Sequence, residues 1–330
     1  MVTMPQKRIN WIDWAKAIAI YAVVLGHVSR STDPQWTVDA ATIGRVFHVP
    51  LFFLVSGYLF RIKESNFRNF IRNSAKSLVI PYLFFNIASA AILWKLQSAE
   101  VYHDGLWGFL LVKGNAFAGP AWFLIVLFII RLIAYGLQQI KSQYFQWGIV
   151  IAMIIVSAVL PIKIGMGISG AILAFPFFFM GMYLKRVEII SKYMELPFVV
   201  KGVLFIIFFG ICFVIRKLDL GMDIGNAAYN GYIVISYLFV FLFVLMTASF
   251  CMLLNGVSLK VVRTISAGCI VIMGFHMTVV QILWAYANKF PDSIQFLFYS
   301  PVNSIISFIL SLFIAIFLMR YAPFLIGNRK

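Results

Sequence analysis

Long apolar runs alternate with short polar segments along almost the whole chain. A helix needs about 20 mostly apolar residues to cross the hydrocarbon core of a bilayer. Ten runs meet or approach this length: 11–29, 43–60, 78–97, 119–138, 147–162, 168–184, 198–215, 229–254, 265–287 and 303–320. The pattern therefore predicts an all-α polytopic bundle of about ten transmembrane helices. The segment 100–118, which contains Trp107 and Phe109, is expected to lie at the membrane interface.

Composition supports a membrane protein rather than a soluble one. Of the 330 residues, 62% are hydrophobic and 12% are charged, against about 45–50% and about 25% in soluble domains. The first run carries Asp13, Lys16 and His27 and lacks a small-residue cleavage site, so it is expected to be a retained span. No linker is evident, and we expect residues 1–330 to form a single membrane-embedded domain.

The net charge of +16 would suggest nucleic acid as a partner for a soluble protein. Here the basic residues lie mostly in short loops, so membrane topology explains them and no nucleic-acid partner is expected. With the N-terminus inside, sixteen fall on the inner side: Lys7, Arg8, Arg61, Lys63, Arg68, Arg72, Lys76, Lys141, Lys185, Arg186, Lys192, Lys260, Arg263, Arg320, Arg329 and Lys330. Seven fall on the outer side: Arg30, Lys95, Lys113, Lys163, Arg216, Lys217 and Lys289. This bias predicts that both termini are cytoplasmic.

Ionisable residues within the first span predict a functional site. Each costs about 2.5–3.5 kcal/mol on insertion scales, so their presence requires a reason. Asp13, Lys16 and His27 are spaced by three and eleven residues and share one helix face. At about 1.5 Å per residue, Lys16 lies about 16 Å from His27, which is near the outer end.

The second span carries a matching set of polar residues near its outer end. Arg45 and His48 are three residues apart, and Ser56 returns to roughly the same face eleven residues after Arg45. His27, Arg45 and His48 are therefore expected at similar depth. Gly57 permits close helix packing.

Three further residues are candidates from other spans. Trp122 lies near the outer end of the run 119–138, Arg131 lies deeper in that run, and His276 is near mid-membrane. Structural roles remain open for all of these positions: Lys16 snorkelling to the interface, Arg45 anchoring there, the histidines packing or capping, and Arg131 forming an ion pair. The histidines lack carboxylate or cysteine partners at ligand spacing, so no metal site is expected.

Four segments, in order, carry a resemblance to a known family: RINWIDWAKAIAIYAVVLGHV, FHVPLFFLVSGYLF, KSLVIPYLFF and GPAWFLIVLF. They resemble the acyltransferase-3 family of integral membrane acyltransferases, in particular the branch of fucose 4-O-acetylases and related sugar O-acetyltransferases. The family's basic-x10-His motif maps onto Lys16 and His27. The arginine pair that many members carry, spaced three apart, is matched here only by Arg72 and Lys76, spaced four apart.

The resemblance implies a bacterial inner-membrane O-acyltransferase. The expected co-substrate is an acyl-CoA, with acetyl favoured, and no permanently bound cofactor is implied. The expected acceptor is a sugar hydroxyl of a surface polysaccharide or a lipid-linked precursor.

Most of the polar residues named above have an expected role in such a reaction. His27 is the expected base, with an acyl-His27 intermediate as the alternative, and Arg45 and His48 orient the acceptor or stabilise charge. Lys16, Arg131 and the basic loop 61–76, with Arg72 and Lys76, are expected to hold coenzyme A. Trp122, Ser56, His276 and Asn226 are expected to contact substrate.

A transporter or flippase for a lipid-linked sugar or small anion is the main alternative, because buried cations and a helix containing Pro50 suit that class too. The acceptor sugar, the acyl group and the oligomeric state are not predicted by the sequence.

Overall fold

The protein is a bundle of helices with one small hairpin. The computed structural model describes residues 8–29, 33–64, 66–159, 164–165, 167–218, 220–287, 289, 291 and 301–327. Its α-helices are α1 (Asn10–Val28), α2 (Gln35–Leu59), α3 (Phe67–Leu93), α4 (Ala99–Leu111), α5 (Trp122–Gln138), α6 (Gln143–Val159), α7 (Ile168–Arg186), α8 (Ile189–Glu195), α9 (Phe198–Ile215), α10 (Ile233–Leu253), α11 (Lys260–Ala287) and α12 (Val302–Tyr321). The strands β1 (Met222–Asp223) and β2 (Ala228–Tyr229) pair antiparallel. Short 3-10 turns are η1 (Gly119–Ala121), η2 (Arg216–Leu218), η3 (Leu254–Gly256) and η5 (Pro323–Ile326).

The all-α prediction is confirmed, and nine helices of the described chain are long and apolar enough to span a membrane. They are α1, α2, α3, α5 with η1, α7, α9 with η2, α10 with η3, α11 and α12. The tenth predicted span corresponds to α6, a shorter apolar helix of 17 residues. At about 1.5 Å per residue it is about 25 Å long, somewhat less than the hydrocarbon core.

Several helices begin or end away from the predicted limits. α3 begins at Phe67 rather than near residue 78, because the Asn66 side chain caps it by accepting a hydrogen bond from the Asn69 N–H at 2.9 Å. The expected basic loop 61–76 is therefore wrong in its second half, and Arg72 and Lys76 lie on a helix. Residues 160–162 of the fifth predicted span, and the counted basic residues Lys7, Arg30, Lys163, Arg329 and Lys330, lie outside the described residues.

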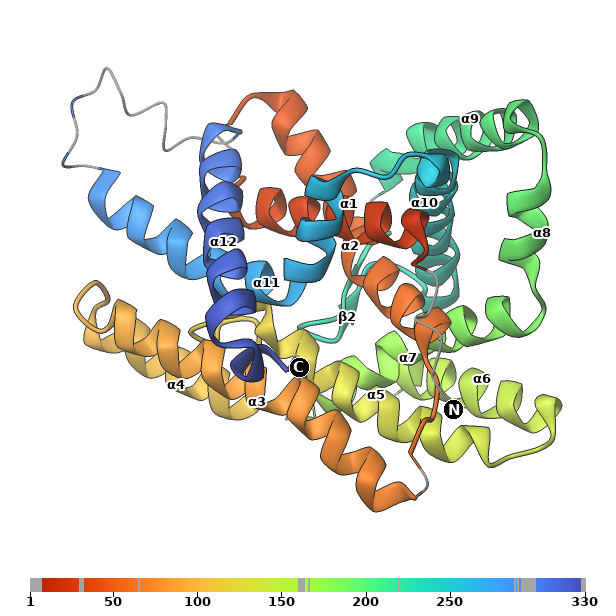
Figure 1. Cartoon of the computed structure of the whole chain (residues 1–330), viewed down its shortest axis with the longest axis horizontal. Coiled ribbons are helices and arrows are strands. Elements are labelled where there is room, and N and C mark those ends of the chain that lie inside the picture. The colour runs from red at the N-terminus through yellow and green to blue at the C-terminus, as the bar shows by residue number, and fades with distance from the viewer. Residues whose placement is uncertain are drawn as a thin grey trace.

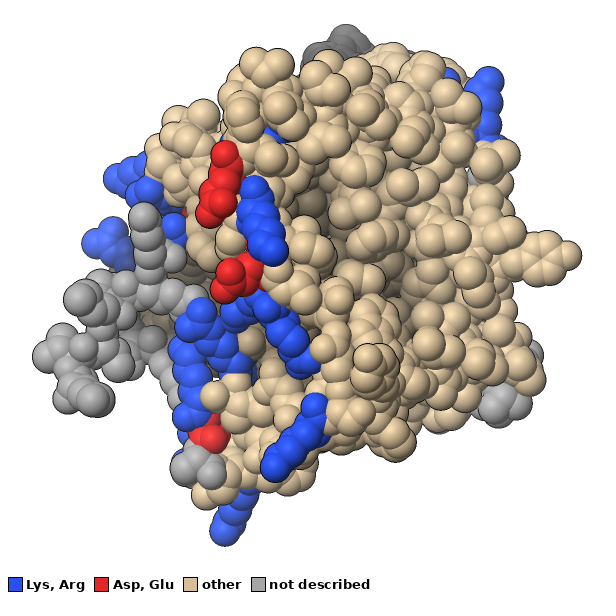
Figure 2. All heavy atoms as spheres, turned by 90° about the vertical axis from the view of Figure 1, so that its right-hand side faces the viewer, with Lys and Arg blue, Asp and Glu red and all other residues tan. Residues whose placement is uncertain are grey.

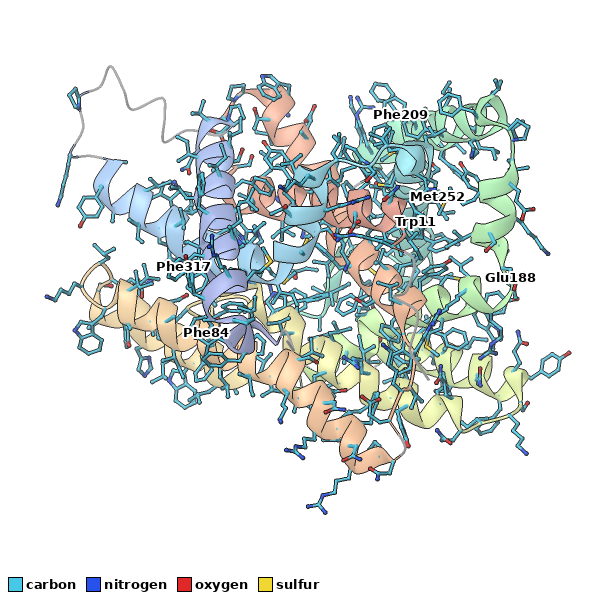
Figure 3. All side chains as sticks on the ribbon, viewed as in Figure 1. Trp11, Phe84, Glu188, Phe209, Met252 and Phe317 are labelled. Carbon is cyan, nitrogen blue, oxygen red and sulfur yellow. The ribbon has the colours of Figure 1, made fainter. Side chains whose placement is uncertain are left out.

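Helix α1 lies at the centre of the bundle, in contact with α2, α10, α11 and α12. Figure 1 shows α3, α4, α5 and α6 as a band below these helices, with α9 at the upper right and α8 linking it to α7. Helix α9 lies at the perimeter, since Cys212 is its one buried residue. In Figure 3 the side chain of Phe209 on α9 lies near the upper edge of the molecule. Phe209 is 50% exposed and Phe317 on α12 is 59% exposed, as expected for lipid-facing residues.

Charged residues avoid the broad apolar surface. Figure 2 shows most of the Lys, Arg, Asp and Glu of one face gathered along one edge, while the rest of that face is almost entirely tan. Helix α4, in the segment predicted to be interfacial, exposes Val101, Leu106, Trp107 and Leu110. Both features fit a bundle whose sides contact lipid.

The tightest helix contact joins α2 to α7. A β-carbon at Gly57 would lie 1.9 Å from the carbonyl oxygen of Phe178, and one at Gly181 would lie 2.0 Å from that of Leu54. Only glycine at these two positions lets the backbones approach this closely. The contact fixes α2, which carries Arg45 and His48, against the bundle.

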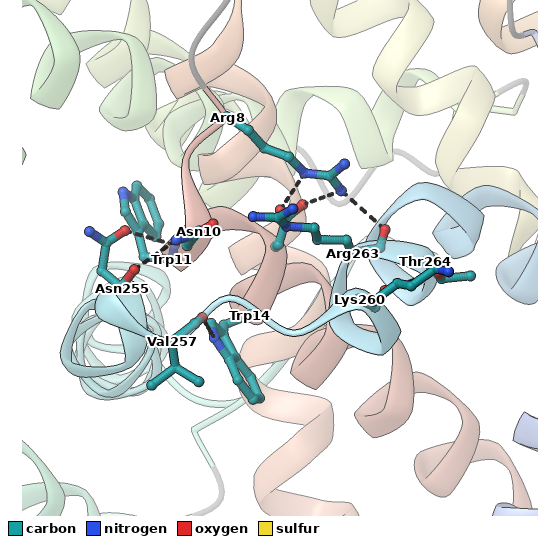
Figure 4. A network of polar contacts seen from close by, with 10 residues as sticks. Arg8, Asn10, Trp11, Trp14, Asn255, Val257, Lys260, Arg263 and Thr264 are labelled. Carbon is teal, nitrogen blue, oxygen red and sulfur yellow. Dashed lines mark hydrogen bonds and ion pairs between the residues drawn. The ribbon is translucent and has the colours of Figure 1, made fainter.

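The N-terminal end of α1 is held by polar contacts with the segment between α10 and α11 (Figure 4). Asn255 accepts a hydrogen bond from the Trp11 N–H at 3.1 Å, and its own carbonyl accepts one from Asn10 at 2.9 Å. Trp14 donates its indole N–H to the carbonyl of Val257 at 2.9 Å. These bonds satisfy groups that would otherwise be orphaned at the helix start and fix the depth of α1 in the bundle.

Candidate active site

A cavity of about 340 Å³ lies near the C-terminal end of α1 and among the helices around it. Its walls come from α1, α2, α5, α11, the segment before α5 and the β1–β2 hairpin. The cavity is lined by five of the residues singled out from the sequence, which are His27, Arg45, His48, Trp122 and Asn226. The structure thus brings together His27, Arg45 and His48 from the first two spans, which their helical spacing predicted to lie at similar depth.

His27 presents one ring nitrogen to this cavity. Its Nδ1 lies 2.7 Å from the carbonyl oxygen of Val23, one turn earlier. A carbonyl only accepts, so Nδ1 carries a proton, and in the neutral ring Nε2 is then the acceptor. The residue is exposed although it belongs to the central helix, because it lines the cavity.

Arg45 lies directly beside His27 because a glycine makes room for it. A β-carbon at Gly26 would stand 3.2 Å from Cγ of Arg45, so the arginine stem crosses α1 at Gly26. One turn below, Gly44 packs against Ala22, whose Cβ would be 3.2 Å from an added β-carbon. The sequence analysis singled out neither glycine, although both are needed for this crossing.

His48 has the same tautomer as His27 and a more enclosed position. Its Nδ1 donates to the carbonyl oxygen of Gly44 at 2.7 Å, and the residue is buried. Its Nε2 is therefore also an acceptor. Of the described polar groups lining the cavity, Arg45 is the cation and is rich in donors.

His276 lies beside this group but does not line the cavity. It is fully buried, and its ring is 5.1 Å from that of His27 in an edge-to-face arrangement. Its Nδ1 faces the carbonyl oxygens of Ile272 and Met273 at 2.9 and 3.1 Å. The expectation that it contacts substrate directly therefore has no support from the cavity geometry.

The segment before α5 supplies another part of the wall, through Gly114 and Pro120. Gly119 has φ +50°, a conformation that favours glycine, and a β-carbon there would lie 2.9 Å from Cγ of Met277. The side chain of Asn86 accepts a hydrogen bond from the Ala118 N–H at 3.1 Å. These contacts set the start of α5, and Trp122 lines the cavity with 8% of its surface exposed.

The β1–β2 hairpin contributes five consecutive lining residues, Met222 to Asn226. Met222 and Ile224 are buried, whereas Asp223 and Asn226 are exposed. The backbone N–H and side-chain amide of Asn226 donate to the two carboxylate oxygens of Asp223 at 3.0 and 2.8 Å. The sequence analysis expected Asn226 to contact substrate but did not predict a hairpin.

Lys16 lines a different recess, of about 390 Å³, near the N-terminal end of α1, the C-terminal end of α2 and the first turns of α11. Arg8 and Asp13 line it too, and their ion pair (2.6 Å) is the one found among the described residues. Lys16 and His27 therefore open toward opposite ends of the same helix.

The remaining predicted residues are dispersed. Arg72 lines a shallow recess at the start of α3, while Lys76, Ser56 and Arg131 line none of the cavities described here. Arg131 stacks on the Phe70 ring at 5.5 Å, and its Nε makes no hydrogen bond within the described part of the chain.

A carboxylate that the sequence analysis did not pair with Arg131 lies near it. Glu64 accepts hydrogen bonds from Asn73 and from the Lys63 N–H. Burial opposes the charge of Glu64, but these bonds and the nearby Arg131 outweigh it and lower the pKa of the carboxyl. The segment 61–76, which is rich in Lys and Arg, therefore also carries the negatively charged carboxylate of Glu64.

Comparison with known proteins places this geometry in context. Residues 9–320 match the family described as "Acyltransferase domain". A 125-residue part is 31% identical to nodulation protein NolL of Mesorhizobium japonicum, covering 36% of this chain and 32% of that protein. A 120-residue part is 33% identical to nodulation protein NolL of Sinorhizobium fredii, covering 34% of this chain and 32% of that protein. The matched segment thus spans about a third of these relatives, and no solved structure matches the chain.

Proposed function

The chain belongs to the acyltransferase family, and from that premise we propose that it is a membrane O-acyltransferase that moves an acetyl group from cytoplasmic acetyl-CoA to a sugar hydroxyl. The sugar belongs to a surface polysaccharide or a lipid-linked precursor and enters from the outer side. The observation that carries the proposal is the His27 ring, whose Nε2 is an acceptor in the neutral ring and which lines one cavity with Arg45 and His48. Family membership favours this function over the transporter alternative.

The base in this proposal is His27. A neutral imidazole with a free Nε2 accepts a proton near neutral pH, and its Nδ1–H bond to Val23 holds the ring in place. The acceptor oxygen attacks the thioester carbonyl carbon while Nε2 takes the hydroxyl proton. When the C–S bond breaks, the proton passes from His27 to the sulfur, giving an O-acetyl ester and the free thiol of coenzyme A.

Arg45 is the group in this proposal that stabilises the developing negative charge. The neutral rings of His27 and His48 have Nε2 as an acceptor, so neither offers an N–H before the proton is transferred, and the proton that His27 then takes up is needed by the leaving sulfur. The guanidinium of Arg45 carries a positive charge and several N–H donors beside His27. His48 then serves to orient the acceptor by receiving a hydrogen bond from a sugar hydroxyl.

The donor in this scheme enters from the opposite side. Lys16 lines the inner recess about 16 Å below His27, given the rise per residue of a helix. An extended arm of coenzyme A, with its phosphates at the inner surface, fits such a separation. Arg72, Lys76 and Arg131 remain candidates for further phosphate contacts.

The test is acetyl transfer by purified protein in liposomes, with radiolabelled acetyl-CoA and a sugar-lipid extract. We expect the wild type to release thiol and form acetylated product, and His27→Ala to lose at least 100-fold in rate, since general base catalysis contributes about 10²–10⁴-fold. His103→Ala is the matched control, because His103 is exposed on α4 and bonds to Trp107 away from the cavity.

Two outcomes would change the proposal. Full activity of a folded His27→Ala protein would remove His27 from the mechanism. A stoichiometric burst of thiol without any acceptor, lost in His27→Ala, would instead identify His27 as the nucleophile that forms an acyl-His intermediate.

A further inference from the structure

The β1–β2 hairpin forms one wall of the cavity. Five consecutive residues of this one segment line the cavity, whereas the rest of the wall comes mainly from helices. The hairpin backbone is seated on two helices. A β-carbon at Gly225 would lie 2.8 Å from the Trp122 indole, and the carbonyl oxygen of Ile224 would lie 2.8 Å from a β-carbon at Gly170.

The hairpin separates buried anchors from exposed polar groups. Met222 and Ile224 are 9% and 3% exposed and hold the hairpin to the bundle. Asp223 and Asn226 are exposed and belong to the cavity lining. The polar pair is therefore placed by packing and does not depend on a ligand for its position.

Asp223 retains capacity for more hydrogen bonds. Each carboxylate oxygen receives one hydrogen bond from Asn226, at 3.0 and 2.8 Å. An ionised carboxylate has about four acceptor sites, so about two remain for hydroxyl groups of a ligand. A carboxylate with two open positions suits neighbouring hydroxyls of a sugar ring.

The charges around the cavity match an uncharged acceptor. Asp223 is the one carboxylate and Arg45 the one guanidinium among the described lining residues, so apart from the histidines the lining carries one formal charge of each sign. A second negative charge on the acceptor would face Asp223 in a confined space, where like charges repel more strongly than in bulk water.

We propose that the β1–β2 hairpin is the acceptor-selecting element of this enzyme, and that the Asp223–Asn226 pair selects an uncharged sugar ring over an acidic one. The inference rests on the proposed function and adds the class of sugar. Asp223 acts on the acceptor alone, because the donor enters at the opposite end of α1.

The test compares methyl glycosides with their matching methyl uronides, which differ by a carboxylate in place of a CH₂OH group. Purified protein in detergent receives acetyl-CoA and each glycoside, and thiol release gives kcat/KM for each acceptor. We expect the wild type to prefer the best uncharged glycoside over its uronide at least tenfold. Asp223→Asn keeps the shape and one acceptor oxygen but removes the charge, so this preference should fall at least tenfold.

Asp39→Asn is the matched control. Asp39 is an exposed carboxylate on α2 that pairs with Gln35 at 2.8 Å and does not line the cavity, so its replacement should leave the preference unchanged. An unchanged preference in a folded Asp223→Asn protein, or a wild type that prefers the uronide, would overturn the hairpin inference alone. If no glycoside accelerates thiol release in the wild type, the sugar-acceptor proposal fails and the hairpin inference fails with it.

Discussion

Three histidines of the bundle hold their rings in the same way. His27, His48 and His276 each place Nδ1 against the carbonyl oxygen four residues earlier, at 2.7, 2.7 and 2.9 Å. Each ring is thereby fixed with its Nε2 as an acceptor. The group is therefore suited to taking protons and depends on another residue for donors, and the residue beside it is Arg45.

Arg45→Ala should lower kcat by about 10²–10³-fold, the usual cost of removing an oxyanion donor. Arg45→Lys should recover part of the loss, because the charge remains but the planar fork of donors does not. Steady-state thiol release measures both variants, and the KM for acetyl-CoA should be unchanged.

The control for this substitution is Arg216→Ala, in the η2 turn that follows α9 at the perimeter. It should behave as wild type. A turnover of Arg45→Ala within twofold of the wild type would show that the oxyanion is stabilised by another group.

At this scale the sequence predicted which helical residues share a depth, and little of what surrounds them. The spacing of His27, Arg45 and His48 on two consecutive spans was enough to expect them together. The crossing at Gly26 and Gly44, and the position of Asp223, follow from contacts between elements distant in the chain. Hydropathy carries no information about such contacts.

At the scale of the elements, the α2–α7 contact fixes the helix that carries Arg45 and His48. Gly57→Ala would put a β-carbon 1.9 Å from the Phe178 carbonyl oxygen. The helices would have to separate, and overpacking of this kind costs typically about 1–3 kcal/mol, occasionally more. We expect Gly57→Ala to lower the thermal unfolding temperature in detergent and to reduce activity.

Gly210→Ala is the control for this prediction. Gly210 lies on α9 with no atom within 4 Å of an added β-carbon. This change should be neutral or stabilising by about 0.5–1 kcal/mol, because alanine favours a helix over glycine. Equal unfolding temperatures for the two variants would show that the α2–α7 contact is looser than described.

The elements themselves were largely predictable because an apolar run of about 20 residues has few alternatives to a spanning helix. The residues at which the helices begin and end were harder to predict. The cap at Asn66 lengthens α3 into a segment that looked like a basic loop. The hairpin was not predicted, because Gly, Asn and Asp in a short segment predict a turn but not which residues on either side of it pair as strands.

At the scale of the whole molecule, the distribution of basic residues predicts that both ends of the chain are cytoplasmic. Cysteine labelling tests this. The native cysteines Cys212, Cys251 and Cys269 are buried, so Lys192→Cys on α8 and Asn230→Cys after β2 can be probed by an impermeant maleimide. Lys192→Cys should react only in inside-out membrane vesicles and Asn230→Cys only in right-side-out ones. The reverse pattern would invert the topology and place the site cavity on the cytoplasmic side.

One recess lies at each end of α1, and we propose that the donor enters at one and the acceptor at the other. Acetyl transfer across the membrane tests this arrangement. Right-side-out vesicles are loaded with radiolabelled acetyl-CoA, and an impermeant glycoside is added outside. We expect labelled ester to appear outside while free coenzyme A thiol accumulates inside, and we expect His27→Ala to abolish both. Ester formation only when acetyl-CoA and glycoside share one compartment would contradict it.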